Sequence, residues 1–133
     1  MAGERLSVTV VGEERVLATR ARLADTFWTR LWGLLGTASL EVGDGLILDP
    51  CDGVHTMGMR YPIDVIFATG EGEVLAVVPA LPPRRATRRV RGARIVIEVP
   101  PGSADGLKPG DRLEFAQAAS TGDAAGSRQD PQP

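Results

Sequence analysis

Apolar residues alternate with polar ones along much of this chain, at the two-residue period of a β-strand that buries one face. Near the start, Leu6, Val8 and Val10 alternate with Ser7 and Thr9. Further strands are predicted at Arg15–Ala21, Leu46–Leu48, Ile63–Phe67, Val74–Val78, Ile95–Val99 and Arg112–Phe115. Turns rich in glycine or proline separate these segments, as is usual where neighbouring strands reverse direction. The pattern therefore predicts a mainly antiparallel β fold.

One segment changes to the period of a helix. Its apolar positions are Leu23, Phe27, Leu31 and Leu34. This spacing places them on one stripe of an amphipathic helix. Gly36 follows the stripe and can end the helix in a left-handed conformation. No other part of the sequence predicts a helix.

These elements fit a single domain. The chain has 133 residues, which is enough for one domain with its own core. Many short strands with one α-helix indicate an antiparallel β-sandwich or small barrel, because a parallel fold would need alternating helices. We expect the domain to span residues 1–116. Residues 117–133 carry no large apolar side chain, so a disordered tail is predicted there.

Composition narrows the function classes. The formal net charge of -2 and the 5% aromatic content argue against general nucleic-acid binding and against base stacking. The single cysteine cannot form an intrachain disulfide. No secretory signal and no apolar run of membrane-spanning length is evident, so we expect a soluble, cytoplasmic protein with no membrane partner.

Five motifs stand in order between Leu17 and Phe115. They are Arg30-Leu31-Trp32-Gly33-Leu34-Leu35-Gly36 (preceded by Thr26), Gly45-Leu46-Ile47-Leu48, His55-Thr56-Met57-Gly58-Met59-Arg60, Pro62-Ile63-Asp64-Val65-Ile66-Phe67, and Glu98-Val99-Pro100-Pro101-Gly102 with Gly110-Asp111. In residue type and spacing the chain resembles the domain-of-unknown-function family 192. The resemblance implies a compact, mainly β, sandwich-like domain with one helix. It implies no activity.

The stretch from Pro50 to Phe67 holds the only cysteine and the only histidine of the chain. Cys51 and His55 stand four positions apart, so a thiolate and an imidazole could form a nucleophilic pair with Asp64 as orienting carboxylate. The same residues could take part in a metal site. One cysteine and one histidine make only half of a structural zinc set, however, so packing and hydrogen bonding are the favoured roles. We expect no catalysis, no metal and no cofactor.

Charged residues around this stretch suggest a ligand site instead. Arg60 and Asp64 flank Pro62, which fixes an extended turn at the entry to a predicted strand. Arg30 lies on the helix face away from the leucine stripe and could cover the same place. The main hypothesis is a non-catalytic accessory domain that binds a small ligand or a partner. Its predicted ligand-binding residues are His55, Arg60, Asp64 and Arg30.

A third feature is a cluster of arginines in one connecting segment. Its members are Arg84, Arg85, Arg88, Arg89, Arg91 and Arg94. A planar guanidinium suits carboxylate or phosphate groups, so the segment could recognise an anionic partner. The simpler interpretation is a solvated loop. The further hypothesis is thus an interaction module that uses this arginine segment.

Overall fold

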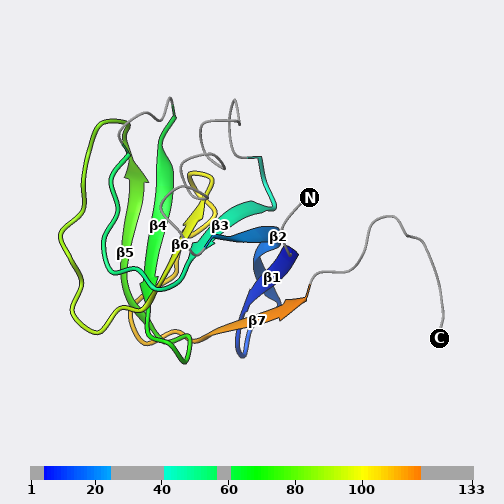
Figure 1. Cartoon of the computed structure of the whole chain (residues 1–133). Coiled ribbons are helices and arrows are strands. Elements are labelled where there is room, and N and C mark those ends of the chain that lie inside the picture. The colour runs from blue at the N-terminus through cyan, green and yellow to red at the C-terminus, as the bar shows by residue number, and fades with distance from the viewer. Residues whose placement is uncertain (1–4, 25–40, 57–60, 118–133) are drawn as a thin grey trace, which may run out of the picture.

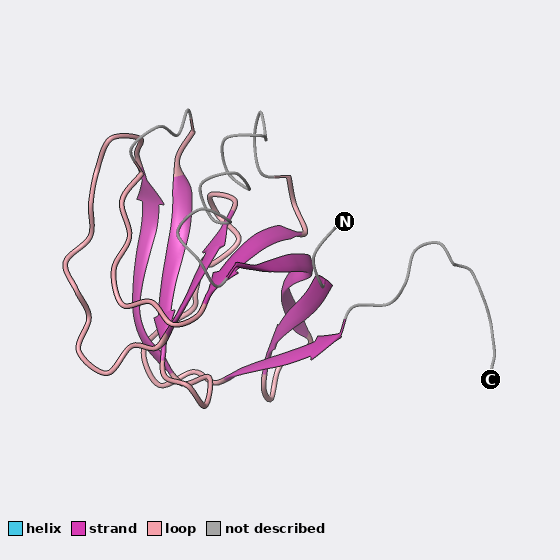
Figure 2. Ribbon diagram, in the orientation of Figure 1, coloured by secondary structure: helices cyan, strands magenta, loops and turns pink. Residues whose placement is uncertain are grey.

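A computed structural model of the chain describes residues 5–24, 41–56 and 61–117. These residues form seven strands (Figures 1 and 2). The strands are β1 (Arg5–Val10), β2 (Arg15–Ala24), β3 (Asp44–Leu48), β4 (Ile63–Ala68), β5 (Val74–Leu81), β6 (Ile95–Val99) and β7 (Leu113–Gln117). The mainly β fold class is confirmed. No helix lies in the described residues, and the predicted helix falls almost entirely on residues 25–40, which lie outside them.

All seven strands belong to one sheet, in the order β5-β4-β6-β3-β2-β1-β7. The sheet curls on itself like half of a barrel (Figure 1), so of the two predicted architectures it is nearer to the small barrel than to the sandwich. The predicted antiparallel pairing holds for every pair except β2 and β3, which run parallel with Arg22 opposite Leu46. Parallel neighbours need a long crossover, and residues 25–43 between these two strands supply it.

The two edges of the curled sheet meet at one end. Glu73, just before β5, forms an isolated bridge with Arg112, just before β7. The N–H of Leu113 donates to the carbonyl of Gly72 over 2.8 Å. Gly72 has a φ of 95°, and a Cβ there would lie 2.5 Å from the Leu113 oxygen, so only glycine fits this approach. The closure at this end brings both edge strands into one core.

A large apolar cluster fills the inner face of the curl. It contains residues from all seven strands and from the loop after β6: Val8, Val10, Leu17, Ala18, Ala21, Ile47, Ile66, Ala68, Val74, Ile95, Ile97, Val99, Ala104, Leu107 and Leu113. Val74 and Leu113 come from opposite edges of the sheet, so their contact in one cluster follows from the curl. We call this the inner core.

A second apolar cluster lies on the other face of β3, β4 and β6. Its buried members are Leu46, Leu48, Val54, Ile63, Val65, Phe67, Leu81 and Val96. We call it the outer core. Because both faces of the central strands are covered, every residue of β4 and β6 is buried. Each fully buried Val, Leu, Ile or Phe side chain stabilises the fold by about 1.5–3 kcal/mol.

The ends of β2 and β7 differ from those predicted from the sequence. β2 continues past Ala21 to Ala24, because parallel pairing with β3 extends the strand. Leu23 therefore lies opposite Ile47 in the sheet, and its assignment to the predicted helix is wrong. β7 includes Gln117, one residue beyond the expected end of the domain. The predicted tail beyond it lies outside the described residues. Within the part of the chain that the structure describes, no helix is long and apolar enough to cross a membrane.

Candidate functional site

Two loop segments that are far apart in the sequence lie side by side on the outer core. Residues 51–56 run antiparallel to residues 84–94, and five backbone hydrogen bonds of 2.7–3.1 Å join them. The donor and acceptor pairs are Cys51 to Arg94, Val90 to Asp52, Thr87 to Val54, Thr56 to Arg85, and Arg84 to Thr56. In Figure 1 the two segments are the neighbouring loops at the left of the molecule. We call this pair of segments the arginine ribbon.

The ribbon has an apolar side and a charged side. Val54 belongs to the outer core, and Cys51, Val90 and Ala93 pack against it. All six arginines of the ribbon are exposed. The apolar contacts hold the ribbon to the sheet, so the guanidinium groups stand on a fixed backbone and face solvent.

Thr56 anchors the end of the ribbon nearest β5. Its side chain is fully buried, and its hydroxyl donates to the Pro82 carbonyl over 2.7 Å. The same oxygen accepts the N–H of Arg85 over 2.8 Å. Arg84, between these partners, has a φ of 64°, a left-handed conformation that costs a residue with a side chain about 1–3 kcal/mol. The bonds to Thr56 on both sides hold Arg84 in it.

Two of the six arginines are paired with carboxylates. Arg89 contacts Asp52 through two nitrogens, with both N–O distances at 3.2 Å. Arg94 donates to Asp49 over 3.0 Å. The side chains of Arg84, Arg85, Arg88 and Arg91 contact no acidic group among the described residues. Six arginines against two aspartates leave the ribbon strongly positive on a chain whose net charge is -2.

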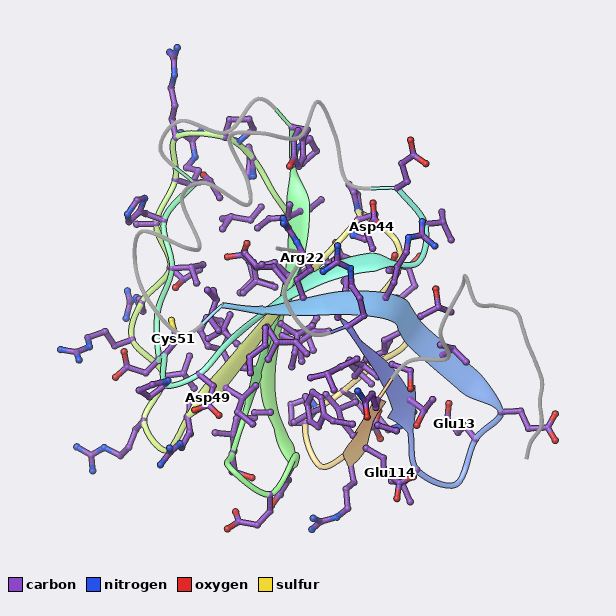
Figure 3. All side chains as sticks on the ribbon, turned by 45° about the vertical axis from the view of Figure 1, so that its right-hand side comes forward. Glu13, Arg22, Asp44, Asp49, Cys51 and Glu114 are labelled. Carbon is purple, nitrogen blue, oxygen red and sulfur yellow. The ribbon has the colours of Figure 1, made fainter. Side chains whose placement is uncertain are left out.

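Two acidic residues lie on the side of the molecule opposite the ribbon. In Figure 3, Cys51 and Asp49 lie on one side of the molecule, while Glu13 and Glu114 lie on the other. Glu13 belongs to the turn between β1 and β2, and Glu114 belongs to β7. Both glutamates therefore lie away from the arginine ribbon.

His55 is the one predicted ligand residue that lies in the ribbon. It stands opposite Ala86 in an isolated bridge, and its side chain is half-buried. The sequence presented His55 and the arginine run as separate features, and the structure places them in one unit. Arg30 and Arg60, the other two predicted basic ligand residues, lie outside the described residues.

Asp64 has a structural role. It is 1% exposed, and its carboxylate accepts backbone N–H bonds from Ala80, Gly102 and Ala104 over 2.8, 2.9 and 3.0 Å. These bonds tie β4 to the end of β5 and to the loop 100–107. None of these partners belongs to the arginine ribbon. The enzyme hypothesis requires this carboxylate to orient His55. Its hydrogen bonds go to backbone amides instead.

Cys51 packs against the outer core. It is half-buried against the outer core, and its thiol donates to the Gly53 carbonyl over 3.1 Å. Among the described residues, no group of three or more His, Cys, Asp or Glu side chains could hold a metal ion. The geometry thus gives the nucleophile and metal alternatives no support beyond the spacing of Cys51 and His55.

The outer face also holds the buried carboxylate of Glu98, a residue that begins one of the five motifs but whose burial was not predicted. Glu98 in β6 is fully buried and stands opposite Leu46 of β3, which in turn stands opposite Arg22 of β2. Figure 3 shows Arg22 and Asp44 on these neighbouring strands. The charges of Glu98, Asp44 and Arg22 all affect the ionisation of Tyr61. Burial raises its pKa above 10.0, the charges of Glu98 and Asp44 raise it further, and Arg22 opposes them.

One signal in the sequence could have found Glu98. It interrupts the run Ile95-Val96-Ile97-Glu98-Val99, whose other members are all apolar. A strand that is apolar on both faces is covered on both faces, so any charged residue within it is buried.

Comparisons with known proteins place the fold in a family. A family model, DUF192, described as "Uncharacterized ACR", matches residues 8–115. No curated protein matches. A crystal structure of a protein of unknown function from Novosphingobium aromaticivorans DSM 12444 is similar with a TM-score of 0.69 and 24% identity, over 83% of this chain and 83% of that one.

A second solved structure agrees. It comes from Sinorhizobium meliloti 1021, is described provisionally as a transcription regulator, and is 21% identical with a TM-score of 0.69. The match covers 86% of this chain and 96% of that one. At these identities both likenesses show the fold alone. The family model spans most of the sequence, in agreement with the resemblance seen in its motifs. The chain belongs to the DUF192 family.

Proposed function

We propose that this chain is a non-catalytic binding module that takes an anionic ligand or partner on the arginine ribbon. The observation that carries the proposal is the group Arg84, Arg85, Arg88 and Arg91, exposed on one pinned segment with no acidic partner among the described residues. The guanidinium group of arginine binds a carboxylate or phosphate group through two parallel hydrogen bonds. His55, Arg60 and Arg30 also belong to the proposed site. A cytoplasmic location is part of the proposal.

The rigidity of the ribbon supports this function. A charged loop that is disordered loses conformational entropy when it binds, and this loss weakens affinity. Here five backbone bonds, the Thr56 anchor and the outer core fix the backbone before any ligand arrives. The left-handed Arg84 supports the proposal too, because strained residues in folded proteins cluster at binding sites.

The experiment compares two double variants of equal charge. Arg85→Gln with Arg88→Gln removes two exposed ribbon charges, and Lys108→Gln with Arg112→Gln removes two exposed charges outside the ribbon. The probe is a heparin oligosaccharide, a general polyanion, and calorimetry at several salt concentrations gives its affinity. We expect the ribbon variant to lose about tenfold in affinity and part of the salt dependence, and the control to lose about twofold or less. Equal losses, or no binding by the unaltered protein, would overturn the proposal.

A further inference from the structure

The arginine ribbon has an open edge. Ala86 and His55 form a bridge flanked by the bonds Thr56 N–H to Arg85 and Thr87 N–H to Val54. In an antiparallel pair with this pattern, the N–H and C=O of Ala86 point away from the partner segment. Within the described residues no hydrogen bond uses either group, and Ala86 is exposed. In Figure 1 the segment 84–94 forms the outer margin of the molecule, so this edge faces solvent.

The charges on this edge are spread along a line. Arg84, Arg85 and Arg88 stand within two residues of Ala86, and Arg91 follows. Residues 85–90 lie between two turns, and an extended segment rises about 3.3 Å per residue, so this stretch spans about 15 Å, with Arg84 and Arg91 at its ends. A compact anion would contact only one or two of these guanidinium groups. An extended polyanion would reach all of them.

The chemistry of the ribbon favours a polypeptide over a nucleic acid. No phenylalanine, tyrosine or tryptophan occurs in residues 51–56 or 84–94, so bases have no aromatic surface on which to stack. An extended peptide, in contrast, can pair with a free strand edge through its main chain while its side chains reach flanking groups.

On the basis of the proposed function, we infer that the ribbon binds an extended acidic segment of a partner protein. Its main chain pairs with the N–H and C=O of Ala86, as an added strand does. Its carboxylates accept hydrogen bonds from Arg84, Arg85 and Arg88. Main-chain pairing fixes the direction of the bound segment, and the arginines select it by charge.

The first test compares polymers of equal charge. An acidic peptide of about ten residues, with Glu or Asp at alternate positions, is titrated against the protein beside an oligothymidylate carrying the same number of charges. We expect the peptide to bind about tenfold more tightly, because only the peptide can use the strand edge. Equal or tighter binding of the oligothymidylate would overturn the inference and leave the anion-binding proposal intact. If heparin binds but neither polymer does, the inference also fails alone. If none of the three binds, both proposals fail.

The second test isolates the main-chain contact. Methylating backbone nitrogens of the peptide at alternate positions removes donors for the Ala86 carbonyl without changing any charge. We expect one of the two alternate methylation patterns to lose about tenfold in affinity, because only one set of N–H groups faces the ribbon. Unchanged affinity for both patterns would overturn the paired-strand geometry. Ala86→Pro, with Ala86→Gly as the control that keeps the N–H, should reproduce the loss from the protein side while heparin affinity stays constant.

Discussion

Two buried polar side chains each hold a loop against the sheet, one on each face. Asp64 binds the loop 100–107 at the inner core through its carboxylate, and Thr56 binds the start of the arginine segment at the outer core through its hydroxyl. The first loop carries one charged side chain, Asp105, whereas the segment that Thr56 holds carries six arginines. The Asp64 anchor thus closes the inner core, whereas the Thr56 anchor holds a segment whose arginines face solvent.

The largest effect should come from the inner anchor. Asp64→Ala leaves three N–H groups without their acceptor inside the protein, and we expect unfolding free energy to fall by about 3 kcal/mol or more. Denaturant titration measures it. Asp111→Ala is the matched control, since that carboxylate also accepts a backbone N–H, from Lys108, but stands at an exposed turn. Equal losses at the two positions would show that Asp64 does not anchor the loop.

The outer anchor should give a smaller loss of stability but a larger loss of binding. Thr56→Val keeps the shape of the side chain and removes the hydroxyl, which should cost about 1–2 kcal/mol. Hydrogen exchange in residues 84–90 should accelerate, and heparin affinity should fall because the ribbon is no longer fixed. Thr69→Val is the control, because that hydroxyl serves only the turn before β5. If both variants leave the exchange of residues 84–90 unchanged, Thr56 is not the anchor of the ribbon.

These anchors show what the sequence could predict and what it could not. Alternating residues and short apolar runs between glycine and proline turns located the strands. The parallel pairing of β2 with β3 was not predictable in this way, since periodicity carries no information about which strand is the neighbour. Leu23 fits the periods of both a strand and a helix, and only its pairing with Ile47 decides between them.

The candidate site was predictable only in its parts. The arginines and His55 are visible in the sequence, but residues 51–56 and 84–94 have no strand period, so their pairing had no local signal. Asp64 stands between two apolar residues of a predicted strand, which hinted at an inward position. Which N–H groups it would bind depended on the path of the loop 100–107. The burial of Glu98, in contrast, follows from the apolar run around it once that run is interpreted as a strand covered on both faces.

The outer face holds the buried carboxylate of Glu98, and its charge affects the ionisation of Tyr61. Because this is the only tyrosine of the chain, its ionisation can be followed by ultraviolet absorbance. Burial and the charge of Glu98 raise the pKa of Tyr61. We expect Glu98→Gln to lower the titration midpoint, and burial to keep it above the ordinary value. Asp44→Asn, whose charge contributes less, should shift it less. An unchanged midpoint in Glu98→Gln would place that carboxylate too far away to matter.

The raised pKa of Tyr61 also gives a pH dependence with a definite sign. The unfolded chain loses the phenol proton near pH 10, while the folded protein keeps it to higher pH. The unfolded state therefore binds fewer protons above that point, so stability is complete below about pH 10 and falls as pH rises toward the folded pKa. Tyr61→Phe should remove this fall, which denaturant midpoints between neutral and alkaline pH would show.

The smallest effect on stability should come from the ion pairs of the ribbon. Asp49→Asn and Asp52→Asn together remove the carboxylate partners of Arg94 and Arg89, which are exposed pairs. Such pairs contribute little, so we expect unfolding free energy to change by less than about 0.5 kcal/mol. The two released guanidinium groups should instead raise heparin affinity by about two- to threefold at low salt, and the gain should vanish at high salt. A large loss of stability would mean that the ion pairs, and not Thr56 with the outer core, fix the ribbon. A loss of affinity would mean that the aspartates hold the arginines in their binding positions.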